Sequence, residues 1–286
     1  MRFSRFICLP AQAMFHMIWK AINGEFFLAT EEPKRQFLDR LFKFFFRANG
    51  SVLVYAFVVM SNHVHTAAEL LGDHDPLSCW LRSSFSSFGL WLNRRLGRYG
   101  PVAKDRFKTL VVQDQDSLMR LMFYLDWNPV KAGLCRHPSE WKYSSYRYYA
   151  YGEVNKWTEH LTPPKWYIAL GKTECDRQRK YRILCDKYYN DQNSLSETTA
   201  DNTYLIGDPE TSKRRSALMQ FVAGLIRKNP SARRSLATTT LGFLSPRAWE
   251  SGTYREDEAF AALQRCIQPS LDGEGNESIY LHGPSS

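Results

Sequence analysis

The stretch VLVYAFVVMSNHVHTAAELL, residues 52–71, decides the fold expected for this chain. It contains two apolar runs, Val52–Val59 and His63–Leu71, separated only by residues 60–62. Runs of this length are typical of β-strands, and a connection this short joins strands that pair antiparallel. The stretch therefore predicts two consecutive strands with a tight turn between them.

Segments on both sides complete an alternating pattern of strands and helices. Apolar and polar residues alternate in the expected strands, and apolar residues recur every three or four positions in the expected helices. The strands are expected at 13–23 and 106–113, and the helices at 31–48, 75–96 and 116–128. The resulting order is strand, helix, strand, strand, helix, strand, helix. This order predicts a ferredoxin-like (RRM-like) α+β domain, an antiparallel sheet with helices on one face.

A change of composition after Gly171 divides the chain. Residues 1–171 carry the elements of the α+β domain. Residues 172–235 are expected to form a basic helical extension. Residues 236–286 are expected to be a mostly flexible tail, because apolar periodicity is weak there and the end of the chain is polar.

The chain is basic, since 38 Lys and Arg against 29 Asp and Glu give a formal net charge of +9. Such a balance favours a polyanionic partner such as nucleic acid. No apolar run approaches the roughly 18 residues of a membrane span, and the N-terminus lacks the clean apolar run of a signal peptide. The six cysteines form neither a CxxC pair nor a zinc-finger pattern. We therefore expect a cytoplasmic protein with reduced thiols and no membrane contact.

His63 and His65 form an HxH pair at the start of the second predicted strand. Residues two apart on a strand point to the same face, so both imidazoles can reach one divalent ion, while Val64 faces the core. Taken alone, such a pair is more often structural than metal-binding. A third ligand elsewhere in the chain is needed to favour the metal site.

Tyr124 and Asn128 are four residues apart in the predicted helix at 116–128, so they share one face of it. The side-chain oxygen of Asn128 sits at the helix C-terminus, a favourable place for a cation. An oxygen ligand beside two imidazoles suits Mg²⁺ or Mn²⁺. The alternatives are an ordinary helix-ending Asn before Pro129 and one more core tyrosine.

A basic and aromatic set of residues is a candidate for DNA contacts, because cations hold phosphates and aromatic rings stack on unpaired bases. The alternatives are solvated surface charges and the rim of an aromatic core. The phosphate-contact candidates are Arg106, Lys108, Lys131, Lys142 and Arg147, and the stacking candidates are Trp141, Tyr143 and Tyr146.

Four motifs, in this order and spacing, resemble the single-tyrosine HUH transposases of the IS200-like transposase family, and among them the REP-associated tyrosine transposases. They are VYAFVVMSNHVH, RFK, YLDWNPVKAGL and WKYSSYRYY, which begin at residues 54, 106, 124 and 141. The resemblance implies that His63 and His65 are metal ligands, that Tyr124 is the nucleophile, and that Asn128 completes the metal site.

The resemblance covers roughly residues 5–152, and the chain departs from it in two places. Ser61 stands where family members usually have proline, and residues 102–105 stand where a Gln-containing segment is common. Neither change alters an inferred ligand or the nucleophile. These changes concern the turn that leads into the strand with His63 and His65, and the local DNA contacts.

The function implied is that of a metal-dependent single-stranded DNA endonuclease and strand transferase, acting in transposition or recombination on hairpin-bearing, REP-like DNA. Cleavage through a 5′-phosphotyrosine intermediate requires a divalent ion, Mg²⁺ or Mn²⁺, and no nucleotide cofactor. Related insertion-sequence enzymes work as dimers that exchange tyrosine helices, whereas REP-associated members act as monomers. A monomer is therefore expected here.

Two other functions stay open. The first is a domesticated protein that binds hairpin DNA without cleaving it. The second is a zinc hydrolase built on the HxH pair, which needs further His or Asp ligands at metal spacing. The other histidines weighed for that role form no such pattern along the sequence, and they are His16, His74, His137 and His160.

Overall fold

The computed structural model describes residue 9, residues 12–192 and short pieces beyond them, at 205–206, 218, 221–222, 224–227, 236 and 262–263. The flexible tail expected at 236–286 lies outside the described residues, apart from 236 and 262–263. Most of the expected basic extension beyond residue 192 lies outside them as well.

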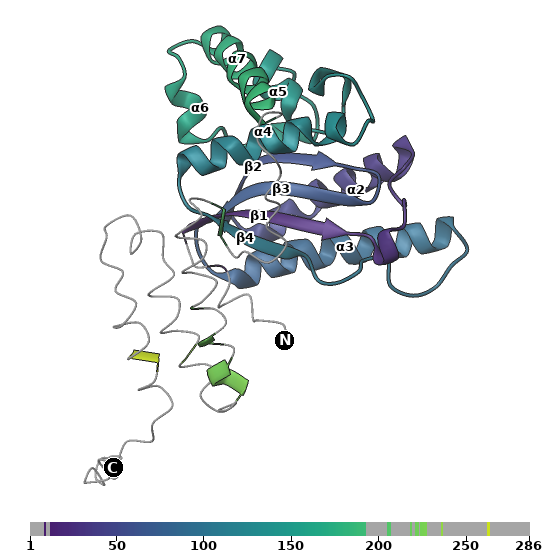
Figure 1. The fold of residues 1–286 in the computed structure, drawn as a ribbon. Helices are drawn as coiled ribbons and strands as arrows, with labels where there is room; N and C mark the ends of the chain where they lie inside the picture. Colours follow the sequence, from purple (N-terminus) through teal and green to yellow (C-terminus); the bar gives the residue numbers. More distant parts are fainter. Residues whose placement is uncertain are drawn as a thin grey trace, which may run out of the picture.

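Five strands form one sheet in the order β2-β3-β1-β4-β5. The four longer strands pair antiparallel with their neighbours, as Figure 1 shows, and they are β1 (Ala13–Lys20), β2 (Val52–Val59), β3 (His63–Leu70) and β4 (Lys108–Val112). The two-residue strand β5 (Leu205–Ile206) pairs parallel with β4. The predicted ferredoxin-like antiparallel sheet is confirmed, and a short strand from far along the chain extends it.

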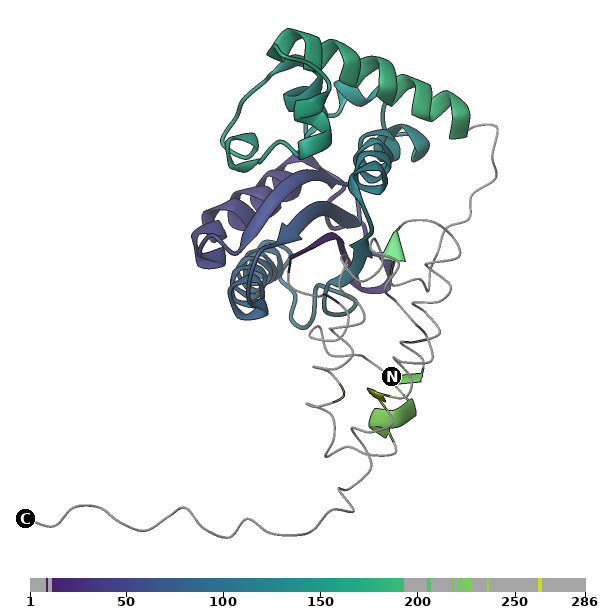
Figure 2. The same cartoon turned by 90° about the vertical axis from the view of Figure 1, so that its left-hand side faces the viewer.

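Helices α2 (Glu31–Lys43) and α3 (His74–Arg95) cover one face of this sheet, as the end-on view in Figure 2 shows. Phe37 of α2 and Phe88 of α3 pack around Trp19 of β1, with ring centroids 5.2 and 6.0 Å from the indole. Each large ring buries about 150–250 Å² of surface. This aromatic cluster therefore fixes both helices to the sheet.

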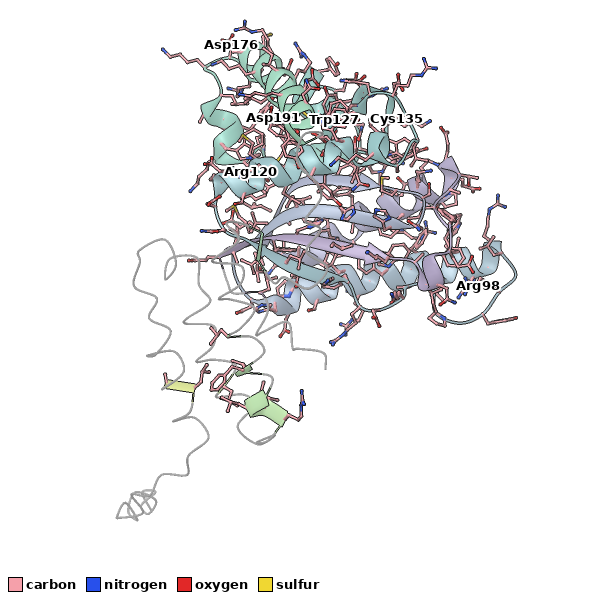
Figure 3. The ribbon with its side chains drawn as sticks, viewed as in Figure 1. Arg98, Arg120, Trp127, Cys135, Asp176 and Asp191 are labelled. Atoms are coloured by element: carbon pink, nitrogen blue, oxygen red, sulfur yellow. The ribbon has the colours of Figure 1, made fainter. Side chains whose placement is uncertain are left out.

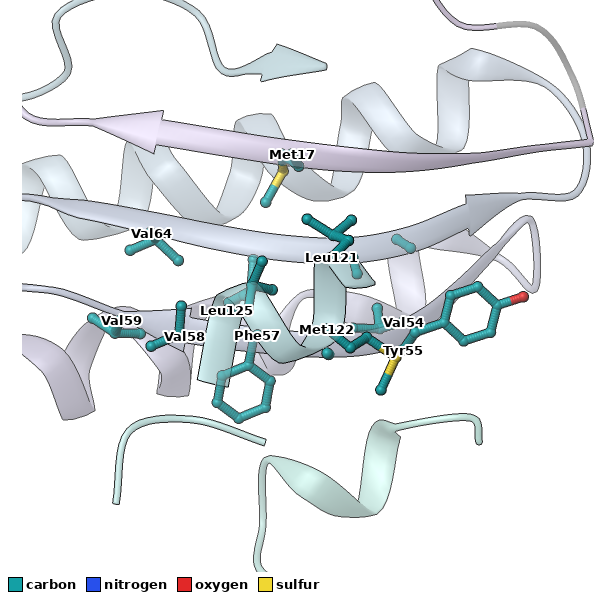
Figure 4. Packing of buried hydrophobic residues seen from close by; sticks show 14 of the residues in the cluster. Met17, Val54, Tyr55, Phe57, Val58, Val59, Val64, Leu121, Met122 and Leu125 are labelled. Atoms are coloured by element: carbon teal, nitrogen blue, oxygen red, sulfur yellow. The ribbon is translucent and has the colours of Figure 1, made fainter. Parts of the chain in front are cut away.

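Helix α4 (Gln115–Lys131) lies across the opposite face, next to β2 and β3 (Figure 2). Its Leu121 and Leu125 are buried in the close-up of Figure 4. The helix begins where the Asp114 carboxylate accepts the backbone N–H of Ser117 at 2.7 Å, which satisfies an otherwise unpaired donor. The expectation of helices on one face thus holds for α2 and α3, and α4 covers the other face.

Helix α4 also continues past the end predicted at Asn128. The sequence argument was that Pro129 lacks an amide proton and disfavours helical geometry before it. In the structure Pro129 is buried inside the helix, and the backbone N–H of Ala132 donates to the Asn128 carbonyl at 3.0 Å. The proline therefore costs one backbone hydrogen bond in the last turn, where burial of its ring offsets the loss.

Three further helices form a layer over α4 (Figure 1). They are α5 (Tyr146–Tyr151), α6 (Lys165–Ala169) and α7 (Glu174–Gln192). Trp127 of α4, labelled in Figure 3, donates from its indole N–H to the carbonyl of Cys185 on α7 at 2.9 Å. Single turns of 3-10 helix connect the larger elements at Ile22–Gly24, Phe45–Ala48, Pro138–Glu140 and Thr158–His160.

A buried acid also joins α7 to α4. The Tyr181 hydroxyl donates to the Asp126 carboxyl at 2.5 Å, and both side chains are almost completely buried. Burial raises the pKa of Asp126 to about 8, and the hydrogen bonds from Tyr181 and Cys185 only partly oppose this shift. Helix α7 therefore shares the core of the first 171 residues, while the division of the chain at that point stays a prediction.

Within the described residues, no helix combines the length and apolar character needed to cross a membrane. The cysteines in that part of the chain are all free thiols, and they are Cys79, Cys135, Cys175 and Cys185. Cys8 and Cys266 lie outside the described residues.

Candidate functional site

Strand register brings three histidines to the face of the sheet that α4 covers. Residues opposite each other in an antiparallel pair point to the same face. His63 of β3 lies opposite Lys20 of β1. His65 lies opposite Ile18, and His16 is two residues before Ile18, so all of these side chains project together.

Val64 points the other way, as the sequence predicts. It lies opposite Trp19 of β1 and is fully buried on the α2 and α3 side (Figure 4). The alternation of the strand therefore turns both histidines of the HxH pair away from the aromatic cluster and toward α4.

His63 and His65 lie against each other, with ring centroids 4.7 Å apart and planes at 82°. The Nδ1 of His63 is 2.7 Å from Oδ1 of Asn62. Because Nδ2 of Asn62 donates to the Gly24 carbonyl at 3.2 Å, Oδ1 is the atom that faces His63, and it can only accept. A neutral His63 therefore carries its proton on Nδ1 and keeps a lone pair on Nε2.

The turn before His63 is held by backbone hydrogen bonds from the segment after β1. The N–H of Ala21 donates to the Asn62 carbonyl and the N–H of Leu28 donates to the Ser61 carbonyl, each at 2.8 Å. In this hydrogen bond Ser61 takes part through its backbone carbonyl. A proline at position 61 would offer the same carbonyl. The serine at this position, where the resembling family usually has proline, therefore leaves this support of the strand intact.

Helix α4 adds Tyr124 and Asn128 to the histidines. The Tyr124 ring meets His65 edge-on with centroids 5.9 Å apart, and His16 with centroids 6.5 Å apart. One turn further on, the side chain of Asn128 lies close enough to His63 to oppose part of the lowering of its pKa. His63 and His65 of one motif therefore lie together with Tyr124 and Asn128 of another, as the sequence predicts. Tyr124 is partly buried there.

All three imidazoles are neutral at neutral pH. Burial lowers the pKa of His16 to about 3 and that of His63 to about 4, and it lowers the pKa of His65 well below the ordinary value. Neighbouring positive charge adds to the effect, from Lys108 at His16 and from Lys20 at His63 and His65. Neutral imidazole is the form that binds metal ions.

The donor set fits a hard divalent ion better than zinc. Across the described residues, no group of three or more His, Cys, Asp and Glu side chains is arranged to hold a metal ion. His63, His65 and Asn128 offer two nitrogens and one amide oxygen, which leaves the remaining positions of an octahedral ion to water or phosphate oxygens. The residues present therefore fit Mg²⁺ or Mn²⁺ with an open coordination sphere.

The other histidines weighed for a zinc site lie elsewhere. His74 bonds to the Leu9 carbonyl, His137 bonds to the Ser139 hydroxyl, and His160 stacks on Phe42. Only His16 joins the centre, and its Nε2 is occupied by the Nδ1 of His65 at 2.8 Å. These contacts give no support to a zinc hydrolase.

Two of the five predicted phosphate contacts lie beside the centre. The Nζ of Lys131 lies 5.9 Å from the centroid of the Tyr124 ring. Lys108 lies opposite Ile18 on the same sheet face. Arg106 is exposed just before β4. Positive charge therefore borders the histidines and the tyrosine.

The remaining two cations are engaged within the protein. Lys142 pairs with Glu31 at 2.5 Å. Arg147 donates to the Ser139 carbonyl at 2.7 Å and pairs with Glu153 at 3.5 Å. Both are partly exposed and paired with neighbouring acids, which favours the alternative of ordinary surface charges for these two residues.

Of the predicted stacking residues, Tyr143 and Tyr146 are buried and Trp141 is partly buried. Tyr146 is completely buried and packs against Tyr181 and His137, so the prediction that it stacks on a base is wrong for this structure. Tyr143 is 6% exposed. The indole of Trp141 donates to the Val59 carbonyl at 3.1 Å. These rings form part of the core because α5 and the preceding loop close over the edge of β2.

Sequence reasoning missed two residues of the centre, His16 and Lys20. Both lie on β1, and the alternation in AMFHMIWK already separates them from Phe15, Met17 and Trp19. What the sequence did not supply was the pairing of β1 with β3, which brings the polar side of β1 against the HxH pair.

Comparisons with known proteins give a weak structural likeness. No protein-family model matches the chain, and no curated protein matches it. Among solved structures, a REP-associated tyrosine transposase bound to a REP hairpin is similar, with 20% sequence identity and a TM-score of 0.44. The match covers 58% of this chain and 95% of that chain. A likeness at this level carries no conclusion about activity, which rests on the residues described above.

Proposed function

We propose that this chain is a metal-dependent single-stranded DNA endonuclease and strand transferase that works through a tyrosine nucleophile on hairpin-bearing, REP-like DNA. The observation that carries the proposal is the meeting of Tyr124 and Asn128 of α4 with His63 and His65 of β3 on one face of the sheet. A tyrosine beside two neutral imidazoles and an amide oxygen supplies both a nucleophile and the ligands of a hard cation.

In the proposed reaction, the phenol oxygen of Tyr124 attacks a phosphorus atom of the DNA. A phosphorus–oxygen bond to Tyr124 forms as the bond to the 3′ oxygen breaks, the phenolic proton is lost and the departing 3′ oxygen gains a proton. A divalent ion held by His63, His65 and Asn128 would supply stabilisation of the charge that develops on the phosphate. Lys131 adds positive charge beside the tyrosine ring.

Rejoining follows from the same chemistry in reverse. A 3′ hydroxyl attacks the 5′-phosphotyrosine and releases Tyr124, so one phosphodiester bond replaces another. The covalent intermediate conserves the bond energy, and the reaction needs no nucleotide cofactor. Strand transfer results when the attacking hydroxyl belongs to another strand, which places the reaction in DNA transposition or recombination.

We propose the monomer as the active unit. Tyr124 lies against the histidines of its own chain, so a single chain carries the ligands and the nucleophile together. The net charge of +9 suits a nucleic acid partner. The free thiols suit the cytoplasm. The similar solved structure is bound to a REP hairpin, which supports hairpin DNA as the first substrate to test.

The test is incubation of the full chain with hairpin-bearing single-stranded DNA and Mn²⁺, followed by denaturing electrophoresis. We expect a protein–DNA adduct that survives denaturation in the wild type and is lost in Tyr124→Phe. Tyr99→Phe is the matched control, because Tyr99 is 96% exposed in the loop after α3, and it should form the adduct normally.

Two results would contradict the proposal in different ways. Tight hairpin binding by the wild type with no adduct for any hairpin supports the alternative of a domesticated DNA-binding protein. An adduct that persists in Tyr124→Phe means that another residue is the nucleophile.

A further inference from the structure

We propose that His16 is a positioning residue for the metal site: it accepts a hydrogen bond from Nδ1 of His65 and thereby keeps Nε2 of His65 unprotonated. That His65 binds a metal ion rests on the proposed function. The hydrogen bond from His65 to His16, and its effect on the tautomer of His65, do not depend on that function.

His16 and His65 form a close, buried pair between two strands. The Nε2 of His16 is 2.8 Å from Nδ1 of His65, the ring centroids are 4.9 Å apart, and the planes differ by only 29°. Each side chain is 4% exposed. His16 lies opposite Ala67 and is therefore the diagonal neighbour of His65, within reach across the β1 and β3 pairing.

One proton between two ring nitrogens decides what His65 can do. If His65 donates from Nδ1, its Nε2 carries a lone pair and can bind a cation. If His16 donates instead, a neutral His65 carries its proton on Nε2 and cannot bind. A partner for the second ring nitrogen commonly fixes the tautomer of a metal-binding histidine. His16 is in the position that such a partner occupies.

His63 has the same arrangement with a different partner. Its Nδ1 donates to Oδ1 of Asn62, as shown above. The two histidines of the HxH pair thus each have Nδ1 occupied by a polar side chain, which is the preceding Asn62 for His63 and His16 of β1 for His65. The matched use of Nδ1 leaves Nε2 of both His63 and His65 for one ion.

The neutral imidazole of His16 suits a site that receives a phosphate. A carboxylate in this position would accept the same hydrogen bond, but its negative charge would repel the DNA phosphate and raise the cost of burial. His16 also meets the Tyr124 ring edge-on, with centroids 6.5 Å apart. It therefore lies beside both a ligand and the nucleophile without adding charge.

Three substitutions separate the hydrogen bond from packing. In His16→Gln, the amide oxygen is as many bonds from Cβ as Nε2 and can accept from His65. In His16→Asn, the amide is one bond shorter and does not reach the same place. In His16→Leu, the pocket stays filled but no acceptor remains. Thermal unfolding of each variant checks that the fold is kept.

The first measurement is the tautomer of His65 in the metal-free chain, read from ¹⁵N shifts of labelled histidine and assigned by its loss in His65→Gln. We expect Nδ1 to carry the proton in the wild type and in His16→Gln, and Nε2 to carry it in a fraction of His16→Leu and His16→Asn molecules. The second measurement is calorimetric Mn²⁺ affinity without DNA. We expect His16→Leu and His16→Asn to bind about 10- to 100-fold more weakly, with His16→Gln near the wild type.

The proposal is overturned if His65 carries its proton on Nε2 in the wild type, if His16→Leu keeps the wild-type tautomer and Mn²⁺ affinity, or if His16→Gln is as weak as His16→Leu. A different result separates the proposed function from this inference. If the tautomers follow the expectation but the wild type binds no Mn²⁺, the positioning by His16 stands and the metal site of the proposed function fails.

Discussion

Asn128 is the residue that distinguishes a metal site from a pair of buried histidines. Two neutral imidazoles alone are a modest donor set, and a hard ion such as Mg²⁺ or Mn²⁺ prefers oxygen ligands. The side chain of Asn128 reaches the vicinity of His63 from the last turns of α4, the end of the helix that favours positive charge. Its oxygen therefore decides which ion the centre can hold.

We expect Asn128→Leu to weaken Mn²⁺ binding by at least about tenfold, because the proposed oxygen ligand of the ion is lost. Asn128→Asp keeps an oxygen and should bind Mn²⁺ at least as tightly as the wild type. Calorimetry on both variants without DNA checks this, with circular dichroism to confirm that α4 is intact. Equal affinity in Asn128→Leu and the wild type would mean that Asn128 is not a ligand of the ion.

At the scale of single residues, the sequence predicts the nucleophile and the proposed metal ligands. It does not predict which side chains hydrogen-bond to them. His63, His65, Tyr124 and Asn128 stand in motifs whose spacing fixes a shared face on a strand or a helix. The hydrogen bond to His16 depends on which strands are neighbours, and no local pattern contains that information. Tyr146 shows the opposite error, since an aromatic ring in a basic stretch suggested a surface that the fold buries.

At the scale of elements, α4 has two working faces. Tyr124 and Asn128 point from one face toward the sheet, while Asp126 and Trp127 on the other face contact α7. Residues three and four apart share a helix face, so this division follows from helical geometry. The layer formed by α5, α6 and α7 therefore holds the helix that presents the nucleophile.

We expect Tyr181→Phe to lower the free energy of unfolding by about 1–3 kcal/mol, because it leaves the buried carboxyl of Asp126 without its hydroxyl partner. Tyr151→Phe is the control, since Tyr151 is 44% exposed and should unfold like the wild type. Urea unfolding measures both. In the background of Asp126→Leu, which removes the carboxyl, the cost of Tyr181→Phe should shrink, and an unchanged cost would assign the effect to packing alone.

Sequence periodicity placed the helices but not their contacts. The continuation of α4 through Pro129 depends on burial of the proline ring, which competes with the local tendency of proline to end a helix. The basic stretch of α7 was expected to belong to an extension of the domain, and its Tyr181 and Cys185 are buried where α7 meets α4. In both helices the observed structure depends on packing against residues elsewhere in the chain, which local periodicity does not contain.

At the scale of the whole molecule, the net charge of +9 matters only where cations are left to meet phosphates. Lys20 and Lys131 are exposed at the centre. The charge of Lys20 lowers the pKa of His63, and the Nζ of Lys131 lies 5.9 Å from the centroid of the Tyr124 ring. Lys142 and Arg147 are also cationic, but each is paired with a carboxylate. Position, more than total charge, should therefore set how each cation affects DNA binding.

We expect Lys20→Ala and Lys131→Ala each to weaken hairpin DNA binding and to reduce the slope of log affinity against log salt by about 0.7 to 1, because one phosphate contact is lost. Lys142→Ala and Arg147→Ala each remove one positive charge as well, and they should leave the slope close to that of the parent. Fluorescence anisotropy between low and moderate salt measures the slope. All variants carry Tyr124→Phe, so that no covalent adduct forms during the titration. If Lys142→Ala lowers the slope as much as Lys131→Ala, the DNA path extends over the loop before α5 and the centre alone does not define the binding surface.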